Sequence, residues 1–157
     1  MAQGRKAGGD NLAQEALAAV LGCADRMEER AVSLLQVLPE LPMDAKLRTA
    51  ASDLGTGLKD TAGRVMFELA LLRARVDEGR ADDAAVVRKL AGLDAAMMTA
   101  LAPLADLADR LEVAAERDEA NERAFVLVIE SAGAMLQNLN DAKEATQALQ
   151  AGLSSAT

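Results

Sequence analysis

Few side chains in this sequence could do chemistry. The 157 residues include no histidine and a single cysteine, Cys23. Histidine is the commonest general base and the commonest transition-metal ligand, and a lone thiol cannot supply a thiolate metal cluster. Only lysines or carboxylates could activate Cys23 as a nucleophile. We therefore expect Cys23 to be a half-buried structural residue on a helix.

Carboxylate pairs occur at helical spacing, as in Asp25 with Glu28 and Asp106 with Asp109. Such pairs could bind a hard cation or act as acid and base. Their ordinary place on a helix is a solvated face, and no calcium-loop pattern accompanies them. The sequence therefore predicts no enzyme activity, no metal site and no cofactor.

A glycine-rich segment, residues 55–61, superficially resembles a phosphate-binding loop. It lacks the order Gly-x-x-x-x-Gly-Lys-Thr, and no strand precedes it. A glycine inside a helix costs about 1 kcal/mol relative to alanine, so several together indicate close packing or a bend. The residues that we expect to serve close packing or a hinge are Gly55, Gly57, Gly63 and Pro103.

Two stretches, residues 65–72 and 125–129, are more apolar than one packing stripe requires. A helix that is apolar all round is buried on several sides. Either these segments are central to the bundle of their own chain, or a second chain covers one of their faces. The residues that we expect at such a partner interface are Met66, Phe67, Leu71, Leu127 and Ile129.

The chain is acidic, with a net charge of −8. The charge is unevenly spread: residues 43–78 carry six acids and six bases, whereas residues 118–150 carry six acids and two bases. An acidic surface repels phosphate backbones and anionic membranes. We therefore expect no nucleic-acid partner and disfavour a membrane, and no uninterrupted apolar run reaches the ~20 residues of a membrane helix.

Cysteine usage bears on the compartment. A single cysteine forms no intramolecular disulfide, which is compatible with a reducing compartment, and we expect a cytoplasmic protein. The segment 20–23 loosely resembles a bacterial lipoprotein cleavage box, so anchoring at Cys23 is the alternative. Asp10 and Glu15 interrupt the apolar stretch that such a signal needs, which favours a plain helix.

The composition predicts an all-α fold. Strong helix formers dominate, and Phe67 and Phe125 are the only aromatic residues. Apolar residues recur at spacings of three and four, which is typical of helices packed on helices. The predicted domain spans residues 10–152, with flexible tails at 1–9 and 153–157. Its predicted helices cover residues 11–38, 43–78, 83–116 and 121–151.

Helix ends are marked by prolines, a glycine and acidic caps. Pro39 and Pro42 separate the first two helices, and Gly79 with Asp82 separates the second from the third. The heptad phase continues across Pro103, which indicates a kink and not an end.

The polar segment 116–123 leaves two topologies open. If the chain turns at Asp118 and Asn121, four helices form an antiparallel up-down bundle, which we favour. If the helix continues, the fold is a helical hairpin plus one long coiled-coil helix. Phe125 keeps the heptad phase of Leu111, which is the argument for the second topology.

The expected function is that of a non-catalytic helical-bundle interaction protein, acting by helix-to-helix recognition. It could be an adaptor, a scaffold subunit or a self-associating coiled-coil module, with a protein partner or a second copy on its apolar faces. One alternative is a small acidic chaperone or regulator that holds an amphipathic partner segment. Another is a bundle that binds a lipid surface or a hydrophobic ligand.

Overall fold

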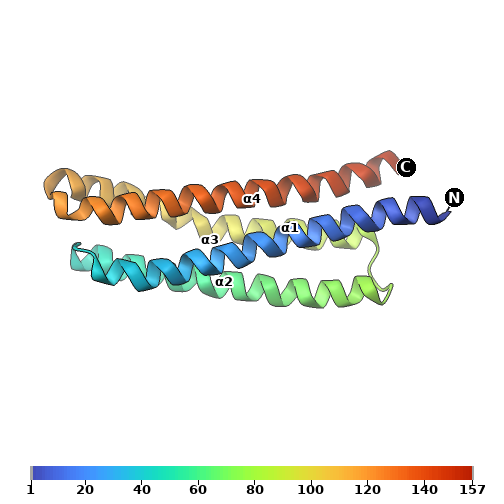
Figure 1. Ribbon diagram of the computed structural model, residues 1–157, viewed down its shortest axis with the longest axis horizontal. Helices are drawn as coiled ribbons and strands as arrows, with labels where there is room; N and C mark the ends of the chain where they lie inside the picture. Colours follow the sequence, from blue (N-terminus) through green and yellow to red (C-terminus); the bar gives the residue numbers. More distant parts are fainter. Residues whose placement is uncertain (1, 157) are drawn as a thin grey trace.

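The computed structural model describes the backbone of residues 2–156 and the side chains of residues 12–154. Four long helices make up the described chain: α1 (Ala2–Val37), α2 (Ala45–Asp77), α3 (Asp83–Arg117) and α4 (Glu122–Ala156). Two short 3-10 turns, η1 (Leu38–Glu40) and η2 (Glu119–Asn121), lie at two of the three connections. The predicted all-α, antiparallel up-down four-helix bundle is confirmed (Figure 1).

The helices follow one another around the bundle, so each packs against the helices before and after it in the sequence, and α4 packs against α1. Across one diagonal α1 also touches α3, whereas α2 and α4 make at most marginal contact across the other. The contact between α2 and α3 is the least extensive of the four neighbouring pairs. As a result α2 is the least covered helix.

The heptad seams supply the core. Each helix turns one stripe inward, and these stripes consist mainly of leucine, alanine, valine and methionine. Burying a leucine or methionine side chain contributes about 1.5–3 kcal/mol, so the core is the main source of stability. The largest fully buried side chains are Met27, Leu34, Leu58, Leu90, Met97, Leu104, Leu111, Met135, Leu139, Leu149, Val20 and Val65.

The connections use the residues that the sequence marks. Gly79 adopts φ +74°, a left-handed conformation that closes α2 and that only glycine adopts without strain. Asp82 then caps α3 by accepting a hydrogen bond from the Ala85 amide at 2.8 Å. The helix α2 begins at Ala45, with Asp44 before it in an extended conformation.

The polar segment between α3 and α4 forms a turn, so the single long helix is ruled out. Asp118 is extended, and its Oδ1 accepts a hydrogen bond from the Ala120 amide at 3.0 Å. The buried Asn121 side chain donates through Nδ2 to the carbonyl oxygens of Ala114 at 3.3 Å and Asp118 at 3.2 Å. The same two carbonyl oxygens also accept the backbone amides of Asp118 and Asn121, so the side chain adds a second bond to each at the end of α3.

Both ends of the chain differ from the sequence expectation of short tails. Helix α1 begins at Ala2, and α4 continues past Gly152 to Ala156. An added Cβ at Gly152 would lie 3.2 Å from Leu12 Cδ1, so α4 approaches α1 closely there. Leu153 also packs against the core. Tertiary contact therefore carries the last turn of α4 beyond its glycine. Residues 1 and 157 lie outside the described part.

Helix α3 is continuous through Pro103. It is also long and apolar enough to cross a membrane, because one 18-residue window has a mean hydropathy of 1.3. This differs from the sequence expectation, since the window tolerates charged residues that break an uninterrupted run. In the bundle, α3 packs against α2 and α4, and its buried face carries leucines and methionines.

Of the predicted packing glycines, only Gly55 faces a neighbour closely. An added Cβ there would lie 2.8 Å from Leu35 Cδ2 and 2.9 Å from Cγ, so α1 and α2 meet closely at this point. An added Cβ at Gly57 or Gly63 would meet nothing within 4 Å. Close packing therefore explains the first glycine and not the other two.

These glycines give a matched pair of substitutions. Gly57→Ala should stabilise the protein by about 1 kcal/mol, since it gains helix propensity in open space. Gly55→Ala gains the same propensity but crowds Leu35, and overpacking costs about 1–3 kcal/mol. Urea unfolding followed by circular dichroism should rank Gly55→Ala well below Gly57→Ala. Equal stabilisation by both would show that α1 and α2 do not pack tightly there.

Candidate interaction surfaces and a buried polar cluster

Among residues 12–154 one carboxylate lies in the core, that of Asp94 on α3, which is only 5% exposed. The Thr146 hydroxyl of α4 lies 3.0 Å from Asp94 Oδ2 and 3.1 Å from the carbonyl oxygen of Ala142. A hydroxyl carries one proton, so the two acceptors compete for it. Asp94 Oδ1 has no hydrogen-bond partner among the described residues. The hydrogen bonds of this carboxyl group therefore only partly replace the water that it loses on burial.

Burial raises the pKa of Asp94 above its ordinary value of 3.8, against the opposing effects of the Thr146 hydrogen bond and the Lys143 charge. Between the ordinary pKa and the raised one, the folded chain holds a proton that the unfolded chain has lost. Stability therefore falls as pH rises through that window. At pH values above that window, the free energy of unfolding is lowered by the full cost of the buried negative charge.

Cys23 is buried near the same region. Burial, followed by the negative charge of Asp94, raises the pKa of the Cys23 thiol to about 11. At neutral pH the thiol stays protonated, and the thiolate is the reactive form. Acylation at Cys23 would require removal of the preceding α1 residues, among which Leu17 and Val20 pack in the core.

Asp94 was not predicted as a site residue. Thr146 sits on the apolar seam of α4, and a polar residue in a core stripe requires a buried partner. That signal was readable, but it does not indicate which helix supplies the partner. The carboxylate pairs that were considered, Asp25 with Glu28 and Asp106 with Asp109, lie on exposed or half-exposed helix faces. No group of three potential metal-ligating side chains occurs within residues 12–154.

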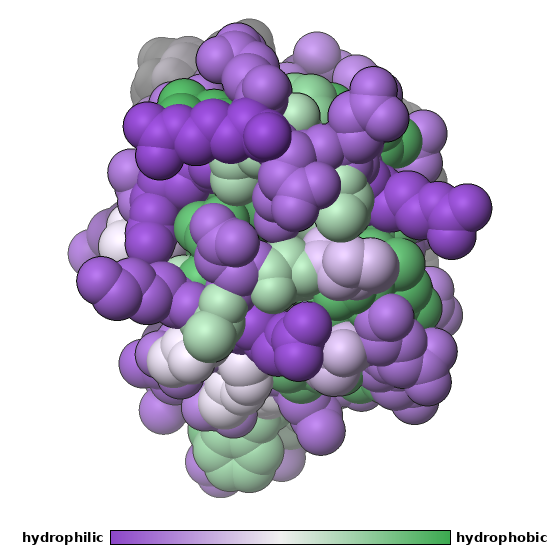
Figure 2. All heavy atoms as spheres, turned by 90° about the vertical axis from the view of Figure 1, so that its left-hand side faces the viewer, coloured by the Kyte–Doolittle hydropathy of each residue, from purple (hydrophilic) through white to green (hydrophobic). Residues whose placement is uncertain are grey.

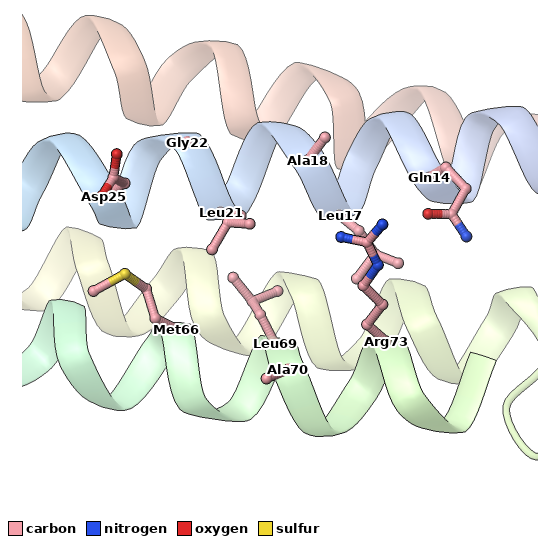
Figure 3. A pocket seen from close by; sticks show the side chains of 10 residues that line it. All are labelled: Gln14, Leu17, Ala18, Leu21, Gly22, Asp25, Met66, Leu69, Ala70 and Arg73. Carbon is pink, nitrogen blue, oxygen red and sulfur yellow. The ribbon is translucent and has the colours of Figure 1, made fainter. Parts of the chain in front are cut away.

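Between α1 and α2 runs a groove of about 510 Å³. Figure 3 shows Leu21 of α1 directed toward Leu69 of α2, and the Arg73 side chain reaching toward α1 beside Leu17. The floor of this groove is apolar, and its rim carries polar side chains. Met66, one of the predicted interface residues, is therefore half-buried in the groove.

Phe67 and Leu71 point away from the bundle on the outer side of α2. Their exposed fractions are 64% and 52%, the two highest among the large apolar side chains of the described residues. Because they are four residues apart on one helix, they form one continuous ridge. We call this pair the outer ridge.

The other predicted interface residues lie elsewhere. Ile129 is 46% exposed on α4, its neighbour Val126 is 43% exposed, and Leu127 is half-buried against the core. Since α2 and α4 occupy opposite corners, the structure does not bring the five predicted residues into one patch. On α2, Met66 faces the α1–α2 groove while Phe67 and Leu71 point outward, and on α4 the half-buried Leu127 and the exposed Ile129 lie on different faces. Sequence periodicity alone does not distinguish these surfaces.

A second groove, of about 450 Å³, lies between α2 and α3. Four of its lining residues are cationic, and Glu68 is its only acid. Glu68 is paired with Lys89 at 2.8 Å. This concentration of positive charge stands out in a chain whose net charge is −8. The cationic residues are Arg75, Arg80, Arg88 and Lys89.

The end of the bundle that holds the α1–α2 and α3–α4 connections has a surface of mixed polar and apolar side chains. Figure 2 shows polar side chains projecting there, with apolar surface exposed between them.

No protein-family model matches the chain, and neither the curated proteins nor the solved structures contain a significant match.

The buried cluster gives a testable pair of variants. Asp94→Asn can still accept the Thr146 hydrogen bond but removes the buried charge, so it should raise the free energy of unfolding at neutral pH and flatten its pH dependence. Thr146→Val removes the one donor to Asp94 among the described residues and should cost about 1–3 kcal/mol. Urea titrations from about pH 4 to about pH 8 measure both effects. A destabilised Asp94→Asn protein at every pH would contradict the electrostatic assignment.

Proposed function

We propose that this protein is a non-catalytic interaction protein that works by helix-to-helix recognition. The observation that carries the proposal is the outer ridge of α2, where Phe67 and Leu71 are 64% and 52% exposed. Contiguous exposed apolar surface of this kind marks contact sites on proteins. Covering such a side chain with a partner contributes about 1.5–3 kcal/mol.

The surroundings of the ridge suit a helical partner. The ridge stands between the α1–α2 groove and the α2–α3 groove, so a helix laid along α2 would meet apolar surface on the α1 side and cationic side chains on the α3 side. Residues 43–78 have no net charge, since their six acids balance their six bases. Approach to this face therefore avoids most of the repulsion that an acidic chain exerts on acidic partners.

The chemistry of the described residues supports a non-catalytic role. The one thiol is buried and protonated, and the one buried carboxylate lies in the core and lines none of the surface grooves described above. Catalytic groups of perturbed pKa are instead expected in a cleft, where substrate can reach them.

A second candidate function rests on the α1–α2 groove. A groove of about 510 Å³ with Leu17, Leu21, Met66 and Leu69 on its sides has the size and polarity of a small hydrophobic ligand site. Binding there would cover Met66 but leave the outer ridge exposed, so the two candidate functions predict different protected residues.

The proposal is tested with a photo-reactive residue in place of Ala74, which is exposed one turn beyond Leu71 on the same face of α2. In the source cell this probe should crosslink to another polypeptide chain. The matched control replaces Val113 of α3, which is 49% exposed and lies on a different helix. Crosslinks confined to the same chain would refute the proposal.

Phe67→Glu combined with Leu71→Glu should abolish the Ala74 crosslink and leave the fold intact, because surface substitutions change stability by about 0.5 kcal/mol or less. Circular dichroism and thermal unfolding check the fold. Loss of helicity in this double variant would instead place both residues in the core of the chain.

A further inference from the structure

Two surfaces of opposite charge are left uncovered by the side chains of residues 12–154. The first is the groove between α2 and α3, which we call the basic groove, with Leu71, Ala81 and Ala85 among its lining residues. Lys89 is paired with Glu68 and Arg80 with Glu78, but Arg75 and Arg88 have no carboxylate partner within the described residues. The groove therefore has positive charge left for an outside partner.

The second surface, which we call the acidic ridge, is the exposed side of η2 and the first turns of α4, where the side chains of this one segment border a shallow hollow of about 440 Å³. The apolar side chains Val126 and Leu127 are flanked there by acids, and Val126 is 43% exposed. Arg123 is the only cation of this surface. Its acids are Glu119, Glu122 and Glu130.

We propose that the acidic ridge of one copy docks into the basic groove of a second copy, so that the protein self-associates head to tail. This inference rests on the proposed function, because it names the partner helix as α4 of another molecule of the same chain. The apolar residues of the two surfaces meet at the centre, and their opposite charges meet around them.

Charge selects this pairing over other contacts between copies. Two chains of −8 repel each other at most orientations. The basic groove holds four cations, and the pairing of two of them with Glu68 and Glu78 leaves a local excess of two positive charges. The acidic ridge holds three acids and one cation, a local excess of two negative charges. Docking the two turns the general repulsion into a local attraction.

The fold also prevents the two surfaces from satisfying each other within one molecule. The basic groove lies at the end of the bundle with the α2–α3 connection, and the acidic ridge begins at the α3–α4 connection at the other end (Figure 1). After one contact forms, each copy still has one surface free. Such a heterologous contact extends into a chain or closes into a ring.

The self-association is tested with two charge-reversed variants. The groove variant carries Arg75→Glu and Arg88→Glu, and the ridge variant carries Glu122→Arg and Glu130→Arg. Each alone should lose self-association, because like charges then face each other. An equimolar mixture should regain association, because the native ridge of the groove variant fits the native groove of the ridge variant, and the two reversed surfaces also carry opposite charges.

Two controls match the change in net charge on other surfaces. Lys46→Glu with Lys59→Glu matches the groove variant, and Glu29→Arg with Asp53→Arg matches the ridge variant. All four residues are exposed outside both surfaces. Both controls should associate as the unaltered protein does, and circular dichroism should show unchanged helicity in every variant.

Sedimentation equilibrium gives the readout. The unaltered protein should exceed its chain mass of 16.4 kDa as concentration rises. That excess should shrink between about 50 mM and about 500 mM salt, because salt screens exposed charges. Association by either variant alone, or a mixture that stays monomeric, would overturn the head-to-tail contact.

The mass in solution and the Ala74 crosslink together distinguish a failure of self-association from a failure of the proposed function. A protein that stays at 16.4 kDa at every concentration overturns self-association. A crosslink from the Ala74 probe to a different polypeptide would then leave helix-to-helix recognition standing, with another protein as the partner. If that crosslink is absent as well, both proposals fall.

Discussion

The bundle depends on four amphipathic stripes that must be buried together. No helix here can hide its leucines and methionines alone, and isolated helices in water are marginal even with good propensity. Each stripe therefore needs two neighbours, and three short connections deliver them in sequence order. The candidate interaction surfaces are then the helix faces that this burial leaves exposed. On α2 that face is apolar, and on the first turns of α4 it is both apolar and acidic.

Local sequence signals predicted most of the architecture. Spacings of three and four identified the seams, while Gly79, Asp82 and the pair Asp118 and Asn121 marked two of the connections. Each of these signals acts within one or two helical turns, so it can be read without knowing the partners. The extension of α4 past Gly152 was not predicted, because it depends on contact with Leu12 of α1, which is far away in the sequence.

The surfaces were only partly predictable for the same reason. Periodicity correctly placed Phe67 and Ile129 outside the narrow seams, but it could not show that their helices occupy opposite corners. Asp94 was missed because its partner Thr146 lies 52 residues further along the chain. Residue spacing assigns a face to each side chain, whereas pairing between helices is a property of the folded bundle. The basic groove was unpredictable for the same reason, because its cations come together only once α2 and α3 lie side by side.

The order of the helices around the bundle also shapes how the chain reaches this structure. Three of the four neighbouring contacts join helices that are consecutive in sequence, so they form between segments only a short connection apart. Contacts of low sequence separation favour rapid folding. The exception is the contact of α1 with α4, which brings the two ends of the chain together at one end of the bundle (Figure 1). Because the entropy of closing a loop grows only slowly with its length, we expect this last closure to be a modest kinetic barrier. A circularly permuted chain that joins the two ends and opens the α1–α2 connection should reach the same bundle.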